Sequence, residues 1–185
     1  MSTGGGKRYA VWYNESGALI IGKRTLPNGA WTTFDLSTVA ANPLVLPVDN
    51  DPHNSASIIV DAAGYIHVAA NMHGDVLRYV RSTNPHDITA WTAPGMTGLN
   101  EAQMTYTRFA LHPDGTVFFL YRDGASGFGD LFLNKERGRH GCVDAGGQAG
   151  RRQDHQREPV RVQVCDRAGR VIEPCDHVAT QRRGR

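Results

Sequence analysis

The sequence predicts an all-β protein, and three observations predict it: strand-like segments, closely spaced turn residues and the lack of a helical period. Between residues 8 and 135, apolar runs of about four to eight residues, rich in β-branched and aromatic side chains, are separated by Gly, Pro, Asn and Asp. Nowhere do apolar residues keep a helical period between capping signals. Helices should therefore be few and short.

The expected strands follow one another along the chain with turn residues after each. Their length and their content of Val, Ile, Thr and aromatic residues fit strands rather than helices. In chain order they are RYAVWYN (8–14), ALIIGKR (18–24), AWTTFDL (30–36), SASIIVD (55–61), GYIHVAA (64–70), DVLRYVR (75–81), MTYTRFAL (104–111), TVFFLYR (116–122) and DLFLNK (130–135).

A repeat along the chain predicts how these strands are arranged. VDAAGYIHVAANMHG (Val60–Gly74) aligns with LHPDGTVFFLYRDG (Leu111–Gly124), since each has an Asp- and Gly-containing turn, an alternating strand and a polar turn ending in Gly. The separation of about fifty residues matches a β-propeller blade, although two such turns also occur in β-sandwiches. Residues 8–135 can hold about two to three four-stranded blades, and a closed ring needs at least about four. The predicted fold class is an incomplete β-propeller, a fragment or part of something larger.

The C-terminal part of the chain differs in composition from the rest. Residues 136–185 contain no aromatic residue, all three cysteines, and 11 Arg against 7 Asp/Glu, a net charge of +4. Residues 1–135 have 9 Lys/Arg against 11 Asp/Glu, so the basic tail sets the pI of about 8.5, which is no sign of a nucleic-acid-binding protein. We expect 136–185 to be a disordered or non-native tail. A shifted reading frame would explain it, because reading its degenerate codons one base later restores aromatic residues.

The N-terminus and the hydropathy pattern argue against several other classes of protein. GGGK at Gly4–Lys7 lacks the earlier glycine of a phosphate-binding loop and follows no strand, so residues 1–7 are expected to be a flexible leader. The sequence has no run of eighteen apolar residues and no signal peptide, which argues against a membrane partner and against classical export. The three cysteines lack zinc-ribbon spacing.

Four motifs give the β region a family resemblance. They are the DPHN turn, the HVAANMH strand end, the TYTRF segment and the YRDGASGFGD turn, in that order along residues 8–135. In these motifs the chain resembles the BNR-repeat (type 4) family of seven-bladed propellers, which is related to polysaccharide lyases acting on ulvan and similar uronic-acid polymers. The resemblance implies an acidic polysaccharide as partner, no cofactor, and an extracellular or periplasmic location for the family.

The resemblance also implies a set of catalytic residues. In the lyases of this group a His/Tyr set moves protons and an Arg faces the uronate carboxylate. Carried over to this sequence, these are His53, His73, Tyr106 and Arg122. The family's TYPRF reads TYTRF here, with Thr107 in place of Pro, which leaves the phenol in place. Which residue is the base, which is the acid, and whether a metal is present stay open.

The chemistry of β-elimination calls for these residue types. The C5 proton of a uronate is weakly acidic unless the enolate charge that develops on its removal is neutralised, and a guanidinium can do this in bidentate fashion. An imidazole or a phenolate can take the proton, and a phenol can return one to the leaving oxygen.

Each candidate also has a simpler interpretation. His53 could be an ordinary polar turn residue, and His73 could contact substrate, bind a metal or serve only the structure. Tyr106 could pack with its hydroxyl at a rim, and Arg122 could pair with Asp123. His67 is expected to be a packed strand residue.

The sequence therefore leaves three possible functions open. The first is a fragment of a lyase-like propeller that cleaves uronic-acid-containing polysaccharide by β-elimination. The alternatives are a non-catalytic carbohydrate-binding propeller and a non-functional truncated product.

Overall fold

The computed structural model describes residues 1–39, 42–44, 51–124 and 129–136, together with the backbone of four short strands farther along the chain. Among these residues the one helical segment is a 3-10 turn, η1 (Leu36–Thr38). The expected all-β class is therefore confirmed. The proposed change of reading frame and the state of the tail concern residues that lie outside the described part.

The first antiparallel sheet is formed, in spatial order, by β1 (Ser2–Gly4), β2 (Lys7–Tyr13), β3 (Leu19–Thr25) and β4 (Thr32–Asp35). The structure differs here from the expected flexible leader. Ser2–Gly4 pair with β2 across a tight turn at Gly5 and Gly6, both with positive φ, and the Ser2 hydroxyl accepts the Val60 backbone N–H of the next sheet. The glycines thus turn a strand back on itself.

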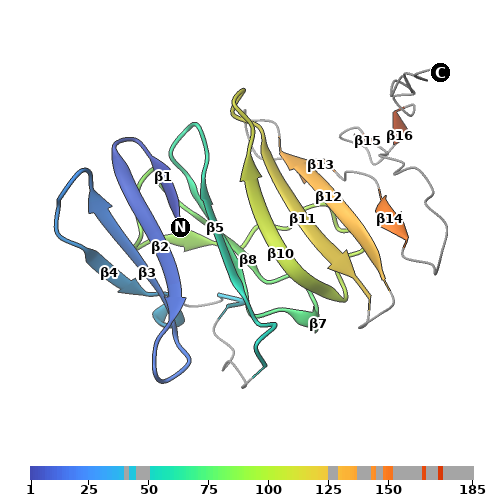
Figure 1. Ribbon diagram of the computed structural model, residues 1–185, viewed down its shortest axis with the longest axis horizontal. Coiled ribbons are helices and arrows are strands. Elements are labelled where there is room, and N and C mark those ends of the chain that lie inside the picture. Colours follow the sequence, from blue (N-terminus) through green and yellow to red (C-terminus); the bar gives the residue numbers. More distant parts are fainter. Residues whose placement is uncertain are drawn as a thin grey trace, which may run out of the picture.

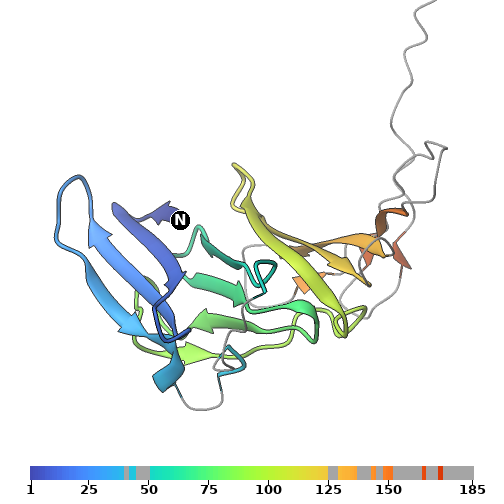
Figure 2. The same cartoon turned by 60° about the horizontal axis from the view of Figure 1, so that its bottom comes forward.

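Two further sheets stand beside the first (Figures 1 and 2). The second contains β5 (Ala56–Val60), β6 (Ile66–Ala70), β8 (Tyr79–Ser82) and β9 (Trp91–Thr92). The third contains β7 (His73–Asp75), β10 (Met104–Leu111), β11 (Val117–Asp123) and β12 (Asp130–Glu136), with β13 (Val143–Asp144) and β14 (Gln148–Arg151) paired to β12. A separate pair is formed by β15 (Val164–Cys165) and β16 (Val171–Ile172). Strand β5 contacts both β2 and β10, so the three sheets are successive propeller blades.

The repeat read from the sequence corresponds to equivalent hairpins, between β5 and β6 and between β10 and β11. A third copy, which the sequence analysis missed, joins β2 to β3. In the β2–β3 turn the Asn14 side chain accepts the backbone N–H groups of residues two and four positions later, and Asp61 does the same in the β5–β6 turn. Each hairpin needs a glycine at positive φ, and these are Gly17, Gly64 and Gly115.

The apolar core lies between the blades. One cluster joins the first and second sheets and includes Tyr9, Ile21, Ile66 and Val68. A second cluster joins the second and third sheets and includes Met72, Met104, Phe119 and Tyr121. Full burial of each large apolar side chain contributes about 1.5–3 kcal/mol. The blades are therefore held together mainly by the faces that they present to one another.

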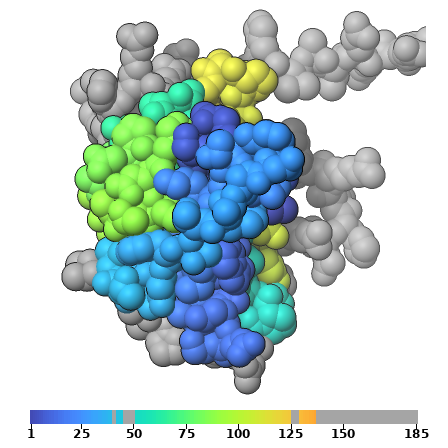
Figure 3. Space-filling view, turned by 90° about the vertical axis from the view of Figure 1, so that its left-hand side faces the viewer, coloured from blue at the N-terminus to red at the C-terminus, as the bar shows by residue number. Residues whose placement is uncertain are grey.

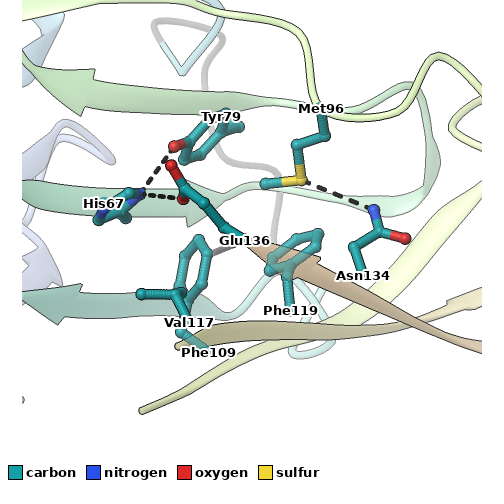
Figure 4. Close-up of a pocket in the computed structure, with 8 residues that line it drawn as sticks. All are labelled: His67, Tyr79, Met96, Phe109, Val117, Phe119, Asn134 and Glu136. Carbon is teal, nitrogen blue, oxygen red and sulfur yellow. Dashed lines mark hydrogen bonds and ion pairs between the residues drawn. The ribbon is translucent and has the colours of Figure 1, made fainter. Parts of the chain in front are cut away.

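A histidine also links each pair of neighbouring blades. Between the first two, His86 Nδ1 lies 2.8 Å from the Tyr9 hydroxyl. Between the second and third, His67 is 1% exposed and its Nδ1 lies 2.7 Å from the Tyr79 hydroxyl and 3.7 Å from Glu136 (Figure 4). His67, Tyr79 and Glu136 line a cavity of about 10 Å³, which has room for about one water molecule and is too small for a sugar. His67 is thus a packed strand residue, as expected.

The first sheet forms much of the surface at one end of the molecule, next to a green segment that follows β6 along the chain (Figure 3). Two of its tryptophans, Trp12 and Trp31, flank Gly22 and are 40% and 43% exposed. The Arg24 guanidinium lies 5.2 Å from the Trp31 ring centre.

We predict that Gly64→Ala destabilises the protein more than Gly6→Ala. Both glycines have positive φ, so an alanine costs roughly 1–2 kcal/mol at either position. Only at Gly64 would the new Cβ also lie 2.6 Å from the His86 ring, while the one at Gly6 meets nothing within 4 Å. The His86 ring cannot easily withdraw, because its Nδ1 is hydrogen-bonded to the Tyr9 hydroxyl and its backbone N–H donates to the Gly64 carbonyl. The extra cost should be about 1–3 kcal/mol in urea unfolding. Equal midpoints for the two variants would contradict the packing described.

Candidate functional site

The four residues predicted from the family motifs lie together in the structure, although they come from four different segments. His53 lies in the turn before β5, His73 begins β7, Tyr106 lies in β10 and Arg122 in β11. The His53 and His73 rings stack with centres 4.4 Å apart, and the Tyr106 ring meets His53 edge-on at 5.7 Å. The Arg122 guanidinium carbon lies 4.8 Å from the Tyr106 ring centre. The side chains therefore form one continuous row.

Strand pairing explains why these residues meet. Thr105 of β10 pairs with His73 of β7 on one side and with Arg122 of β11 on the other. The Thr105 hydroxyl also accepts the Gly74 backbone N–H at 2.8 Å, which ties the end of β7 to β10. His73 and Arg122 are thus brought to either side of the residue that precedes Tyr106.

The backbone of β10 is irregular at Tyr106. The pairing with β11 shifts register between Thr105 and Arg108, which marks a β-bulge. Tyr106 has a φ of 58°, a left-handed conformation that is rare for a residue with a large side chain. Its neighbours Thr105 and Thr107 are buried, whereas Tyr106 is 44% exposed. The bulge therefore turns the phenol out of the sheet while Thr107 stays inside it.

Arg122 is held against Tyr106 with part of its hydrogen-bonding capacity unused. Its Nε atom is buried and has no hydrogen-bond partner among the described residues. The expected alternative, an ion pair with Asp123, is not among the ion pairs of the described part of the chain. A guanidinium in this state is suited to bind a planar anion such as a carboxylate.

The sequence analysis missed Asp51, which links the two imidazoles. One carboxylate oxygen lies 2.5 Å from His53 Nδ1, and the other is hydrogen-bonded to His73 Nδ1. The His53 backbone N–H and both imidazoles lower the pKa of Asp51 to about 2, so the carboxylate is ionised at neutral pH. Asp51 begins the same DPHN motif that drew attention to His53, so the signal was present in the sequence.

Asp51, His53 and His73 could also hold a metal ion. One ligand atom from each lies within 4.8 Å of the others, and a carboxylate with two imidazoles is a donor set found in zinc and non-haem iron sites. In this structure the two Nδ1 atoms are instead hydrogen-bonded to the carboxylate.

Comparison with known proteins places this site in a family. The sequence model described as "BNR repeat-containing family member" matches residues 7–169, most of the chain. The chain belongs to the BNR repeat-containing family. This match runs past residue 135, where the sequence analysis ended the propeller.

Two individual proteins show what this member of the BNR repeat-containing family is similar to. An ulvan lyase from Nonlabens ulvanivorans is 27% identical and aligns with 40% of this chain and 18% of its own length. The crystal structure of polysaccharide lyase Uly1 is 16% identical and superimposes on 77% of this chain with a TM-score of 0.59, covering 40% of that protein. The chain thus spans well under half the length of either relative. It shares the fold of a polysaccharide lyase.

No helix in the described residues is long and apolar enough to cross a membrane.

We predict that the left-handed backbone at Tyr106 makes Tyr106→Val less stable than Tyr106→Asn. Both variants lose the aromatic ring, but Asn tolerates a φ near 58° and β-branched Val does not. The difference in the free energy of unfolding should be about 1–2 kcal/mol, measured by urea titration. A Val variant as stable as the Asn variant would show that residue 106 does not keep this backbone conformation.

Proposed function

We propose that this chain forms part of a lyase that cleaves uronic-acid-containing polysaccharide by β-elimination. The observation that carries the proposal is the row of His73, His53, Tyr106 and Arg122, in which proton-transfer groups stand beside a partly unpaired guanidinium. The names of the ulvan lyase and of the polysaccharide lyase Uly1 support the same chemistry. Since the chain covers only part of either relative, the activity of the whole protein is part of the proposal.

In the proposed reaction Arg122 binds the carboxylate of the uronate. Removal of the C5 proton sends charge into that carboxylate, so a fixed cation there stabilises the transition state more than the ground state. Arg122 is only half-buried, so its guanidinium is open to this anion. The Tyr106 ring beneath the guanidinium fixes its plane through a cation–π contact.

Proton transfer falls to the phenol and the imidazoles. A base takes the C5 proton, a double bond forms between C4 and C5, and the C4–O bond breaks, so that the leaving oxygen receives a proton from an acid. Tyr106 stands between Arg122 and His53, which suits it to reach the atoms next to the bound carboxylate. The His53 imidazole contacts the Tyr106 ring and the His73 imidazole stacks on His53, so both stand beside that region.

We predict that Tyr106→Phe abolishes the release of unsaturated uronate from an ulvan-type polysaccharide, measured by its ultraviolet absorbance. The substitution keeps the ring under Arg122 and removes only the hydroxyl. Tyr65→Phe is a matched control, because Tyr65 also carries an arginine over its ring, with Arg81 at 5.1 Å, but lies in the β5–β6 turn. It should keep wild-type activity.

The outcomes of this experiment separate the proposed functions. Undiminished release by Tyr106→Phe would remove Tyr106 from the mechanism. Polysaccharide binding by the wild-type chain without any release would favour the non-catalytic carbohydrate-binding propeller. Neither binding nor release by a folded chain would favour a non-functional product.

We also predict that Arg122→Lys lowers kcat/KM by about tenfold to a hundredfold, because an ammonium keeps the charge but loses the bidentate fork. Arg81→Lys, the corresponding change at the other arginine–tyrosine pair, should leave kcat/KM unchanged. The measurement is initial rate against polysaccharide concentration. An Arg122→Lys enzyme with unaltered kinetics would argue against carboxylate recognition by this residue.

A further inference from the structure

Asp51 makes an unusual set of contacts for a residue in a surface turn. Its two carboxylate oxygens are shared between two imidazoles, one from its own turn and one from β7, 22 residues farther along the chain. Its Oδ1 also accepts the His53 backbone N–H at 2.9 Å, and its carbonyl accepts the Asn54 N–H. The turn that carries His53 therefore also fixes the carboxylate.

We propose that Asp51 is a positioning residue that holds both His53 and His73 in the tautomer with the proton on Nδ1, leaving both Nε2 atoms free to accept a proton. The proposal rests on the proposed function, in which these imidazoles take part in proton transfer. It adds a third group, the Asp51 carboxylate, which orients the two imidazoles for proton transfer.

The chemistry of the hydrogen bonds determines the tautomer. An ionised carboxylate can only accept hydrogen bonds, so an imidazole nitrogen that is hydrogen-bonded to it must carry a proton. Both nitrogens in contact with Asp51 are Nδ1. A neutral imidazole has a single N–H, and Nε2 of each ring is therefore the atom with a lone pair.

A bound metal ion would require the opposite protonation. If Asp51, His53 and His73 ligated a cation through the same atoms, both Nδ1 atoms would have to lose their protons. The proton on Nδ1 thus distinguishes the positioning role from metal ligation without any measurement of activity.

The first test is nitrogen NMR of the histidine side chains in the ¹⁵N-labelled chain near pH 8, with signals assigned through His53→Gln and His73→Gln. In the wild type, both rings should show a protonated Nδ1 and an unprotonated Nε2. An unprotonated Nδ1 on either ring would overturn the proposal, and it would do so without any variant at Asp51.

The second test replaces Asp51 by Asn, which keeps the shape but turns one accepting oxygen into a donating amide. The ring that faces the amide should change to the Nε2–H tautomer. Asp61→Asn is the matched control. Asp61 lies 3.4 Å from His67 Nε2, and Asn14 already fills the equivalent position in the first hairpin, so the His53 and His73 signals should not move. Unchanged signals in Asp51→Asn would overturn the proposal.

The kinetic consequence follows from the tautomers. Asp51→Asn should lower kcat by about tenfold or more, because a wrong tautomer disables proton transfer, while KM changes little because Arg122 still binds the carboxylate. Asp51→Glu, which keeps an accepting carboxylate, should recover part of the loss. A loss of kcat/KM that comes entirely from a higher KM, with kcat unchanged, would overturn the positioning role. If the wild type shows the expected tautomers but no lyase activity, the proposed function is wrong, but the conclusion that Asp51 sets the tautomers of His53 and His73 is still supported.

Discussion

The pairing of β7 with β10 is the constraint on which the candidate site depends. Along the chain, strand β7 lies between β6 and β8 of the second blade, but it hydrogen-bonds to β10 of the third, so it carries His73 across the gap between blades. Asp51 and His53 reach the same place from the turn before β5. Without the crossing of β7, His73 would lie with the second blade, and the row from Arg122 to His73 would be broken.

The contacts between blades keep this crossing in register. Apolar faces supply most of the stabilisation, but apolar packing alone tolerates sliding. The half-buried His86 hydrogen-bonds Tyr9 of the first blade, and the buried His67 pairs with Glu136 of the third, so both contacts depend on one relative position of two blades. A buried polar group that loses its partner is costly, so these contacts penalise any shift of one sheet against the next.

The sequence predicted local features well and long-range features less well. The longer strands and two of the glycine turns were predicted because their patterns lie within about ten residues of sequence, whereas the short strands β7 and β9 were not. Strand β1 was missed because three short polar residues become a strand only when β2 and Val60 are beside them. The left-handed Tyr106 was missed because a bulge is defined by the partner strand, which no local pattern reveals.

In the candidate site, too, local sequence motifs were recognised and a long-range contact was missed. His53, His73, Tyr106 and Arg122 were found through the family motifs, and their catalytic roles stay predictions. Asp51 escaped notice because an aspartate in a turn is common, and its importance arises only when a second imidazole arrives from β7.

Under the proposed function, the distribution of charge along the row gives the substrate a direction. Arg122 stands at one end, and the ionised Asp51 is hydrogen-bonded to the two imidazoles at the other. An acidic sugar is drawn towards the guanidinium and repelled by the carboxylate. Its carboxylate therefore settles beside Arg122, which leaves the neighbouring carbon next to Tyr106 and His53. The same Asp51 that sets the imidazole tautomers would then also oppose binding of the uronate in the reverse orientation.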